Sequence, residues 1–394
     1  METLVIGRSL ELKNRSIAGK VRSSINSHNV AIGLVASTFY AFSASPAMFE
    51  ITASMGLSKT AQVSWYAGTF LTSALAGILL SWRYRMPLPM GWSLPGLIFL
   101  AASATTYSHA QIVSGVILAG LIMIAVGASG LADRLMEVVP LPVATGVFAG
   151  TVFGYVSAGF DNLSASPFIA GMAITGYFAA VSFNRQWLPP MAVAMIAGLV
   201  AAATRGQLNG SDGDFSLAVI APVMPALDAG SAVAIAIPLV LMAIGLGNLQ
   251  GLAILKSEGF DPPIRTVTIA SGVTTLINAA FGGHVSSLQS NGTAIMATAG
   301  AGPKKHRYVS TLIASVAALT MAIAAGSIGA LLGIIPGELV TTLASLALLV
   351  ALLDALRKTI SSAFPMSGFV AMMVASSSMS LLGLGSALWG FAIG

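Results

Sequence analysis

Apolar runs of about 20 residues recur along almost the whole chain, and they limit its fold more than any other feature. A helix of that length spans the hydrocarbon core of a bilayer, whereas a transmembrane β-barrel would show short alternating segments. Only 8% of the residues are charged and 56% are hydrophobic, compared with about 25% charged residues in soluble domains. The sequence therefore predicts an all-α integral membrane protein.

Fourteen candidate spans follow a basic N-terminal segment, residues 1–28. They cover residues 30–50, 61–82, 87–104, 111–130, 138–159, 167–183, 188–204, 231–255, 265–281, 284–300, 308–329, 338–356, 364–380 and 381–393. With a cytoplasmic N-terminus, this count leaves 16 of the 18 Lys and Arg residues inside and only Lys59 and Arg205 outside. Such asymmetry is typical of inner membrane proteins, so we expect a multi-pass protein of a bacterial inner membrane with both termini in the cytoplasm. The basic segment also predicts contact with anionic membrane lipid.

The chain divides into two halves of similar pattern, residues 29–204 and 231–394, joined by an external linker at 205–230. In each half the first span ends near a glycine, Gly56 or Gly259, and is followed by an apolar helix and then by a broken span. Seven spans per half is an odd number, so the second half must be inverted in the bilayer. Inverted repeats of this kind are typical of secondary transporters.

The first broken span contains the sequence PMGWSLPG at residues 89–96. Its prolines cannot donate backbone hydrogen bonds, which predicts an extended stretch over residues 87–93. A helix is expected from Leu94, with Pro95 in its first turn and Ser93 as the N-cap.

The second broken span contains GGHVSSLQSNGTA at residues 282–294. Two glycines interrupt the helix there, and residues 284–290 are expected to be extended. A second helix is predicted to begin near Asn291, capped by Ser290 or Asn291.

Non-helical backbone at membrane depth is tolerated only where protein or a water-filled cavity covers it. Because the halves are inverted, the N-termini of the two half-helices should meet near the bilayer midplane, where their N–H groups and partial positive charges suit an anion. No Lys or Arg lies in the middle of a predicted span. We therefore expect dipoles and neutral donors to hold an anionic substrate; the alternative is that both breaks are packing kinks.

Further polar candidates lie in spans one and eight. Asn248 and Gln250 are amides inside an apolar span, and they bind either the substrate or a neighbouring helix. Span one supplies Tyr40 and Ser43, and Trp92 could stack on an aromatic substrate. The predicted substrate-binding residues are Tyr40, Ser43, Trp92, Ser93, Leu94, Gly96, Asn248, Gln250, Ser287, Gln289, Ser290, Asn291 and Gly292.

Ionisable side chains are rare within the spans. His284 begins the second broken span and titrates near physiological pH, and Glu50 lies near the outer end of span one, so both are candidates for proton coupling. Asp354 lies beside basic residues and is expected to be a solvated loop charge.

Other chemistry finds no support in the sequence. The chain has no cysteine, no phosphate-binding loop, no HExxH motif and no His, Asp and Glu cluster with metal-ligand spacing. The basic residues border membrane spans and do not form a nucleic-acid patch. We therefore expect no enzyme, no cofactor, no metal and no nucleic-acid partner, and a homodimer is left open.

Several motifs resemble the benzoate–proton symporter family. Tyr84-Arg85-Met86-Pro87 followed by Trp92-Ser93-Leu94-Pro95-Gly96 is similar to its YRxP…WSxPG signature. Three further segments are similar to the family. They are Asn248-Leu249…Gly251 with Ala253-Ile254-Leu255 in span eight, the stretch Phe281-Gly282-Gly283-His284, and the C-terminal residues 381–394.

The resemblance implies an architecture similar to that of nucleobase–ascorbate and sulfate-type transporters. It implies a core domain, residues 29–132 and 231–330, that moves against a gate domain, residues 133–204 and 331–394. It also implies short strands in spans three and ten beside the substrate, and uptake of benzoate or a related carboxylate together with a proton.

Two departures from the family pattern touch the expected site. The run from Ser286 to Asn291 is more polar than is usual, and Gln250 stands where the family often has proline. A more polar organic anion, or a proton-coupled nucleobase or heterocycle carrier, is therefore left open, as is a channel-like anion conductor.

Overall fold

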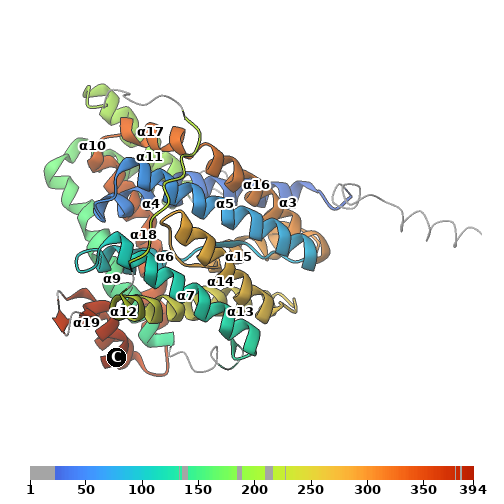
Figure 1. Cartoon of the computed structure of the whole chain (residues 1–394). Helices are drawn as coiled ribbons and strands as arrows, with labels where there is room; N and C mark the ends of the chain where they lie inside the picture. The colour runs from blue at the N-terminus through green and yellow to red at the C-terminus, as the bar shows by residue number, and fades with distance from the viewer. Residues whose placement is uncertain are drawn as a thin grey trace, which may run out of the picture.

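Helices occur in each of the fourteen predicted segments of the computed structural model (Figure 1). The structure describes residues 23–132, 134, 141–183, 189–208, 216–226, 228–377, 379–381 and 384–394. Most of the predicted N-terminal segment, residues 1–22, and part of the predicted linker, residues 209–215, lie outside these ranges. Within the described part, seven helices are long and apolar enough to cross a membrane, and shorter apolar helices accompany them.

The helices and the strand of the first half follow one another in the predicted order, with a π-helical turn inside the first span. They are α3 (Ser27–Phe39), a π-helical turn (Tyr40–Ala44), α4 (Ser45–Ser54), α5 (Lys59–Tyr84), β1 (Met90–Trp92), α6 (Leu94–Ser103), α7 (His109–Ser129), α9 (Leu141–Ala165), α10 (Pro167–Phe183) and α11 (Pro190–Thr204). The second half repeats the pattern with α12 (Ala229–Leu241), a π-helical turn (Met242–Asn248), α13 (Leu249–Ser257), α14 (Ile264–Ala280), β2 (Ser286–Leu288), α15 (Ser290–Met296), α16 (Tyr308–Ile323), α17 (Ala325–Ile334), α18 (Gly337–Ile360), α19 (Pro365–Ser376), β3 (Ser380–Leu381), β4 (Leu384–Gly385) and α20 (Ser386–Ile393).

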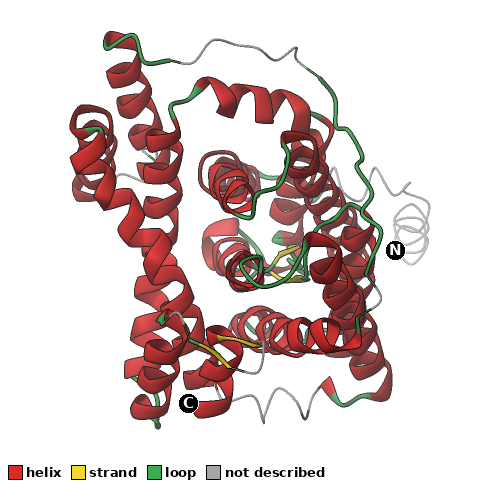
Figure 2. Ribbon diagram, turned by 60° about the vertical axis from the view of Figure 1, so that its left-hand side comes forward, coloured by secondary structure: helices red, strands yellow, loops and turns green. Residues whose placement is uncertain are grey.

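The extended stretches of the two broken spans pair with each other, and Figure 2 shows this strand pair among the helices. Strands β1 and β2 are antiparallel, with Gly91 opposite Ser287. The pairing continues past both strands, because Ser93 N donates to Val285 O at 3.1 Å and Gln289 N donates to Pro89 O at 2.9 Å. Each break thus supplies hydrogen-bond partners for the other, which removes much of the cost of non-helical backbone in an apolar bundle.

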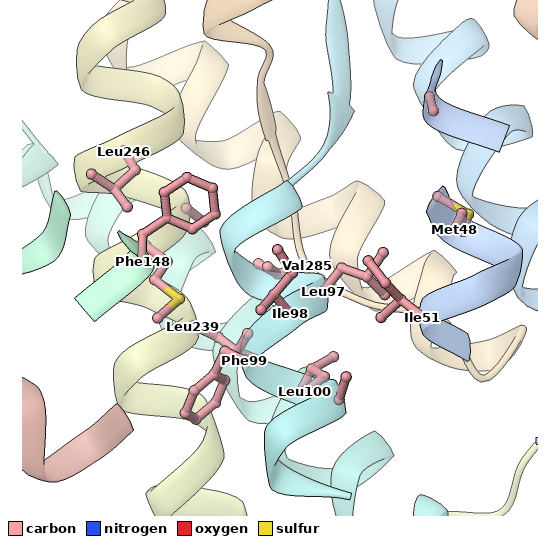
Figure 3. Close-up of a cluster of buried hydrophobic side chains, with 14 of the residues drawn as sticks. Met48, Ile51, Leu97, Ile98, Phe99, Leu100, Phe148, Leu239, Leu246 and Val285 are labelled. Carbon is pink, nitrogen blue, oxygen red and sulfur yellow. The ribbon is translucent and has the colours of Figure 1, made fainter. Parts of the chain in front are cut away.

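Helix α6 is buried in the largest hydrophobic cluster (Figure 3). Its residues Leu97, Ile98 and Leu100 have no exposed surface. They lie between side chains of the first span, such as Ile51, and side chains of the α12 span, such as Leu239. This packing fixes the direction of the half-helix that follows β1.

A second group of helices adjoins α6, and three of its members, α9, α18 and α19, contribute side chains such as Phe148, Leu348 and Ala371 to the same cluster. Helices α18 and α19 pack on α9, and α10 packs on α11. A separate hydrophobic cluster joins this group, with Ile169 and Ala173 of α10 against Leu339 and Leu343 of α18. Only α18 of this group makes extensive contact with α4.

Three predicted boundaries were wrong. The predicted span at 308–329 ends at Ile323, because Ile323 O and Ser327 N bond to Ala218 N and Ser216 O of the linker. The last predicted span, 381–393, contains a helix of only eight residues, because the β3–β4 hairpin takes its first residues. Helix α15 begins after Gln289, and neither Ser290 nor Asn291 is its cap.

Candidate substrate site

A cavity of about 120 Å³ lies where the two broken spans meet α9 and α18. Its lining residues are Phe39, Trp92, Ser93, Leu94, Pro95, Thr145, Phe148, Leu246, Gly247, Gln250, Ser287, Leu288, Gln289, Ser290, Asn291, Gly292, Ala351, Asp354, Ala355 and Lys358. A larger hollow of about 540 Å³ shares several of these residues and adds Ser43, Ala47 and Arg357. We call the two together the substrate cavity. Nine of the thirteen predicted substrate residues line the smaller part.

The first broken span contributes Trp92, Ser93 and Leu94 to the cavity. Ser93 has the predicted capping role, since its Oγ accepts a hydrogen bond from Gly96 N at 3.2 Å. Gly96 is not among the lining residues. A Cβ at this position would lie 2.6 Å from Val285 Cγ1, so Gly96 allows α6 to approach the second broken span closely.

The second broken span contributes Ser287, Gln289, Ser290, Asn291 and Gly292, so that the lining continues from β2 into the first turn of α15. Gln289 is held in place because its Oε1 accepts a hydrogen bond from the Tyr40 hydroxyl at 2.7 Å. Tyr40 therefore positions a lining residue and lies behind the cavity wall. Ser43 lines only the larger hollow.

The outer edge of β2 is bonded to side chains of other helices. Ser286 N donates to Thr275 Oγ1 at 2.9 Å, and Leu288 N donates to Asn248 Oδ1 at 2.7 Å. Asn278 Nδ2 donates to His284 O at 3.0 Å. Asn248 is fully buried and absent from the cavity lining, so the structure places it as a support of β2.

Helices α9 and α18 supply lining residues that the sequence did not indicate, including Phe148, Asp354 and Lys358. Lys358 Nζ donates to Gln250 Oε1 at 2.8 Å and to Asp354 Oδ2 at 2.5 Å. Asp354 was predicted to be a solvated loop charge; the loop assignment was wrong, because Asp354 lies within α18, which extends to Ile360, while its side chain is 53% exposed. An i, i+4 acid–base pair at the end of an apolar span was the available signal.

His284 is fully buried and lines none of the described cavities. Trp65 Nε1 donates to His284 Nδ1 at 2.8 Å, so Nε2 carries the proton of the neutral imidazole. Nε2 is buried without a partner among the described residues. The side chain also contacts Trp92, with 6.0 Å between ring centroids.

Glu50 lines a different hollow of about 840 Å³, bounded by α4, α5, α17, the linker and the start of α18. Its Oε1 accepts a hydrogen bond from Thr341 Oγ1 at 2.8 Å. The two hollows lie along the same pair of helices, α4 and α18. Between them, Met48 and Ala344 are almost completely buried, so packed side chains separate the two spaces.

Metal binding finds no support in the described part of the chain, where no three His, Asp or Glu side chains form a group that could hold an ion.

Residues 23–394 match the family model described as BenE, benzoate membrane transport protein. A benzoate membrane transport protein of Acinetobacter baylyi is 28% identical over 352 residues, which is 88% of each chain. An inner membrane protein of Escherichia coli, YdcO, is 24% identical over 356 residues, or 90% of each chain.

Solved structures of anion transporters share the fold. The transmembrane domain of a cyanobacterial bicarbonate transporter, BicA, has a TM-score of 0.63 at 18% identity, covering 89% of this chain and 94% of that one. The overall structure of SLC26A9 has a TM-score of 0.65 at 14% identity and covers 93% of this chain and 63% of the other. At these identities the similarity describes the fold only.

Proposed function

Because the chain belongs to the benzoate membrane transport protein family, we propose that it carries benzoate or a related small aromatic carboxylate by alternating access. It is a multi-pass membrane protein of a transporter family and not an enzyme. The relative named as an inner membrane protein supports the same location here, and the distribution of Lys and Arg supports our proposal that both termini lie in the cytoplasm.

The substrate cavity is the observation that carries this proposal. One side presents polar groups at the start of two helices, Ser93 on α6 and Ser290 and Asn291 on α15. Aromatic side chains, Trp92 and Phe148, supply apolar surface in the same space. A planar ring with one carboxylate matches this division, since donors and helix N-termini favour the anion and aromatic faces favour the ring.

We propose that the chain crosses the membrane as two inverted repeats of seven segments. In this arrangement residues 29–132 and 231–330 form the core, and residues 133–204 and 331–394 form the gate. The packing of α18 and α19 on α9, and the separate hydrophobic cluster that joins α10, α11 and α18, support the division. The antiparallel pairing of β1 with β2 supports the inversion, because corresponding strands of inverted halves run in opposite directions.

The two hollows along α4 and α18 support alternating access. The substrate cavity lies beside Arg357 and Lys358, which the charge pattern places in the cytoplasm. The hollow around Glu50 lies beside Lys59, one of the two basic residues predicted outside. A movement of the core along α18 opens the bound substrate to the cytoplasm through the substrate cavity in one position, and to the outside through the hollow around Glu50 in the other.

Proton coupling is assigned to Glu50, with His284 as the second candidate. Glu50 is open to the predicted external hollow and bonds to Thr341 of the gate, so its protonation changes a contact between core and gate. His284 contacts Trp92 at the cavity but lines none of the described hollows itself. A carboxylate that meets both water and the moving surface is better placed to couple the two events.

Uptake by the full chain in proteoliposomes tests the proposal. An inward proton gradient should accelerate benzoate uptake by the wild type, and Glu50→Gln should abolish that acceleration. Glu338→Gln is the matched control, because Glu338 lies in the first turn of α18 outside this hollow. Loss of the acceleration in His284→Asn alone would transfer the role to His284.

The same preparation separates the competing functions. Uracil that displaces benzoate would favour a nucleobase carrier, and currents far above carrier turnover would favour a channel. Absence of any benzoate uptake by the wild type would overturn the proposed substrate.

A further inference from the structure

One cationic side chain of the substrate cavity, Lys358, bridges two of its walls. Lys358 lies on α18, and its Nζ contacts Gln250 Oε1 on α13 at 2.8 Å. It is the single Lys or Arg among the described residues that line the smaller part of the cavity. Its side chain is 35% exposed, so the ammonium group is accessible from the space that a substrate enters.

The ammonium group is already neutralised by an acid of its own helix. Asp354 Oδ2 lies 2.5 Å from Lys358 Nζ, and the two residues are one helical turn apart. The smaller part of the substrate cavity therefore carries a balanced pair of charges, since Arg357 lines only the larger part, and a carboxylate that enters the smaller part adds one negative charge. An ammonium group has three N–H donors, and the structure assigns two of them, to Gln250 and Asp354.

We propose that Lys358 is the specificity-determining residue that selects a carboxylate over neutral analogues, an inference that rests on the proposed function. Asp354 then competes with the substrate for the ammonium group of Lys358. On binding, Lys358 shifts its hydrogen bonds from Asp354 toward the substrate carboxylate. A substrate without the negative charge cannot displace Asp354. The half-helices then orient the anion, and Lys358 supplies the charge that they lack.

This assignment predicts opposite effects for the two partners. Lys358→Met should raise the KM for benzoate about tenfold or more, since hydrogen bonds to charged groups contribute that much to affinity. Asp354→Asn should lower the KM, because it removes the competing anion and keeps the helix. Lys358→Arg should retain much of the uptake, because the cation remains.

Neutral ligands provide the readout that distinguishes selection from folding. Thermal-shift binding of benzamide, the neutral analogue, should be unchanged or stronger in Lys358→Met while benzoate binding is lost. Lys256→Met is the matched control, because Lys256 lies exposed in the last turn of α13 and lines none of the described cavities. It should leave both ligands unaffected.

The outcomes separate the two proposals. If the wild type neither binds nor transports benzoate, the proposed function fails. If the wild type transports benzoate and Lys358→Met keeps the same KM, the role of Lys358 is overturned while the function stands. If Lys358→Met does not fold, Asp354→Asn decides, because an unchanged or higher KM for benzoate contradicts competition.

Discussion

Replacing Thr275 by Val tests whether side chains of α14 hold the second broken span in its extended form. Thr275 Oγ1 accepts the hydrogen bond of Ser286 N at 2.9 Å, and both residues are buried. Valine has nearly the same shape but cannot accept a hydrogen bond, so Ser286 N–H remains buried without a partner. Such a group costs about 1–3 kcal/mol. A cost of about 2 kcal/mol corresponds to a factor of about 30 in the population of the native arrangement of β2.

Thr274→Val is the matched control, because the hydroxyl of Thr274 bonds only to carbonyls of its own helix, Ala270 O and Ser271 O. Thermal unfolding of the purified chain and the KM for benzoate in proteoliposomes measure the effect. We expect Thr275→Val to lower the unfolding midpoint and raise the KM well beyond the control. Equal behaviour of the two variants would refute the view that this bond positions the strand.

Three further predictions concern other parts of the fold. Gly96→Ala should reduce stability by about 1–3 kcal/mol through overpacking, and Val285→Ala in the same chain should recover part of it, as measured by thermal unfolding. Trp65→Phe should destabilise the chain by about 1–3 kcal/mol, because the buried Nδ1 of His284 loses its donor; an unchanged unfolding midpoint would contradict this. Hydrogen bonds from Ser231 and Gln111 hold the pKa of Asp228 below its usual value, so its stabilising contribution is present above pH 3.8 and disappears as pH falls through the depressed pKa. The difference in unfolding midpoint between Asp228→Asn and the wild type should therefore become smaller as the pH falls, as measured by thermal unfolding.

The breaks in spans three and ten could be predicted because their causes are local. Proline removes a backbone donor at its own position, and a serine before the first helical turn caps that turn. The extended stretch before Leu94, the start of α6 and the capping role of Ser93 are all confirmed. The signal was weaker in the second broken span, where Gln289 bonds to Tyr40 and no side chain caps α15.

The residues that the sequence missed depend on contacts between distant segments. Lys358 enters the cavity because α18 runs one turn further than its apolar pattern indicates and meets Gln250, which lies 108 positions earlier. Asn248 was identified as an unusual amide, but its partner Leu288 N is a backbone group of a strand whose register no local pattern determines. Polarity in an apolar span thus indicates that a residue is used, while its contacts decide whether it meets substrate or supports the wall.

Helix α18 contacts the proposed core near both of its ends, which links the site to the proposed movement. Near its start, Thr341 donates a hydrogen bond to Glu50, and near its end, Lys358 donates one to Gln250; both distances are 2.8 Å. The two contacts are separated by roughly 25 Å along the helix, given a rise of about 1.5 Å per residue. A shift of the core by even one helical turn must break at least one of them. Each contact is a single hydrogen bond to a charged group, worth about 1.5–3 kcal/mol. Protonation of Glu50 weakens the first, and water or the substrate carboxylate can replace Gln250 in the second. Chemistry at either end of α18 therefore changes which position of the core is favoured.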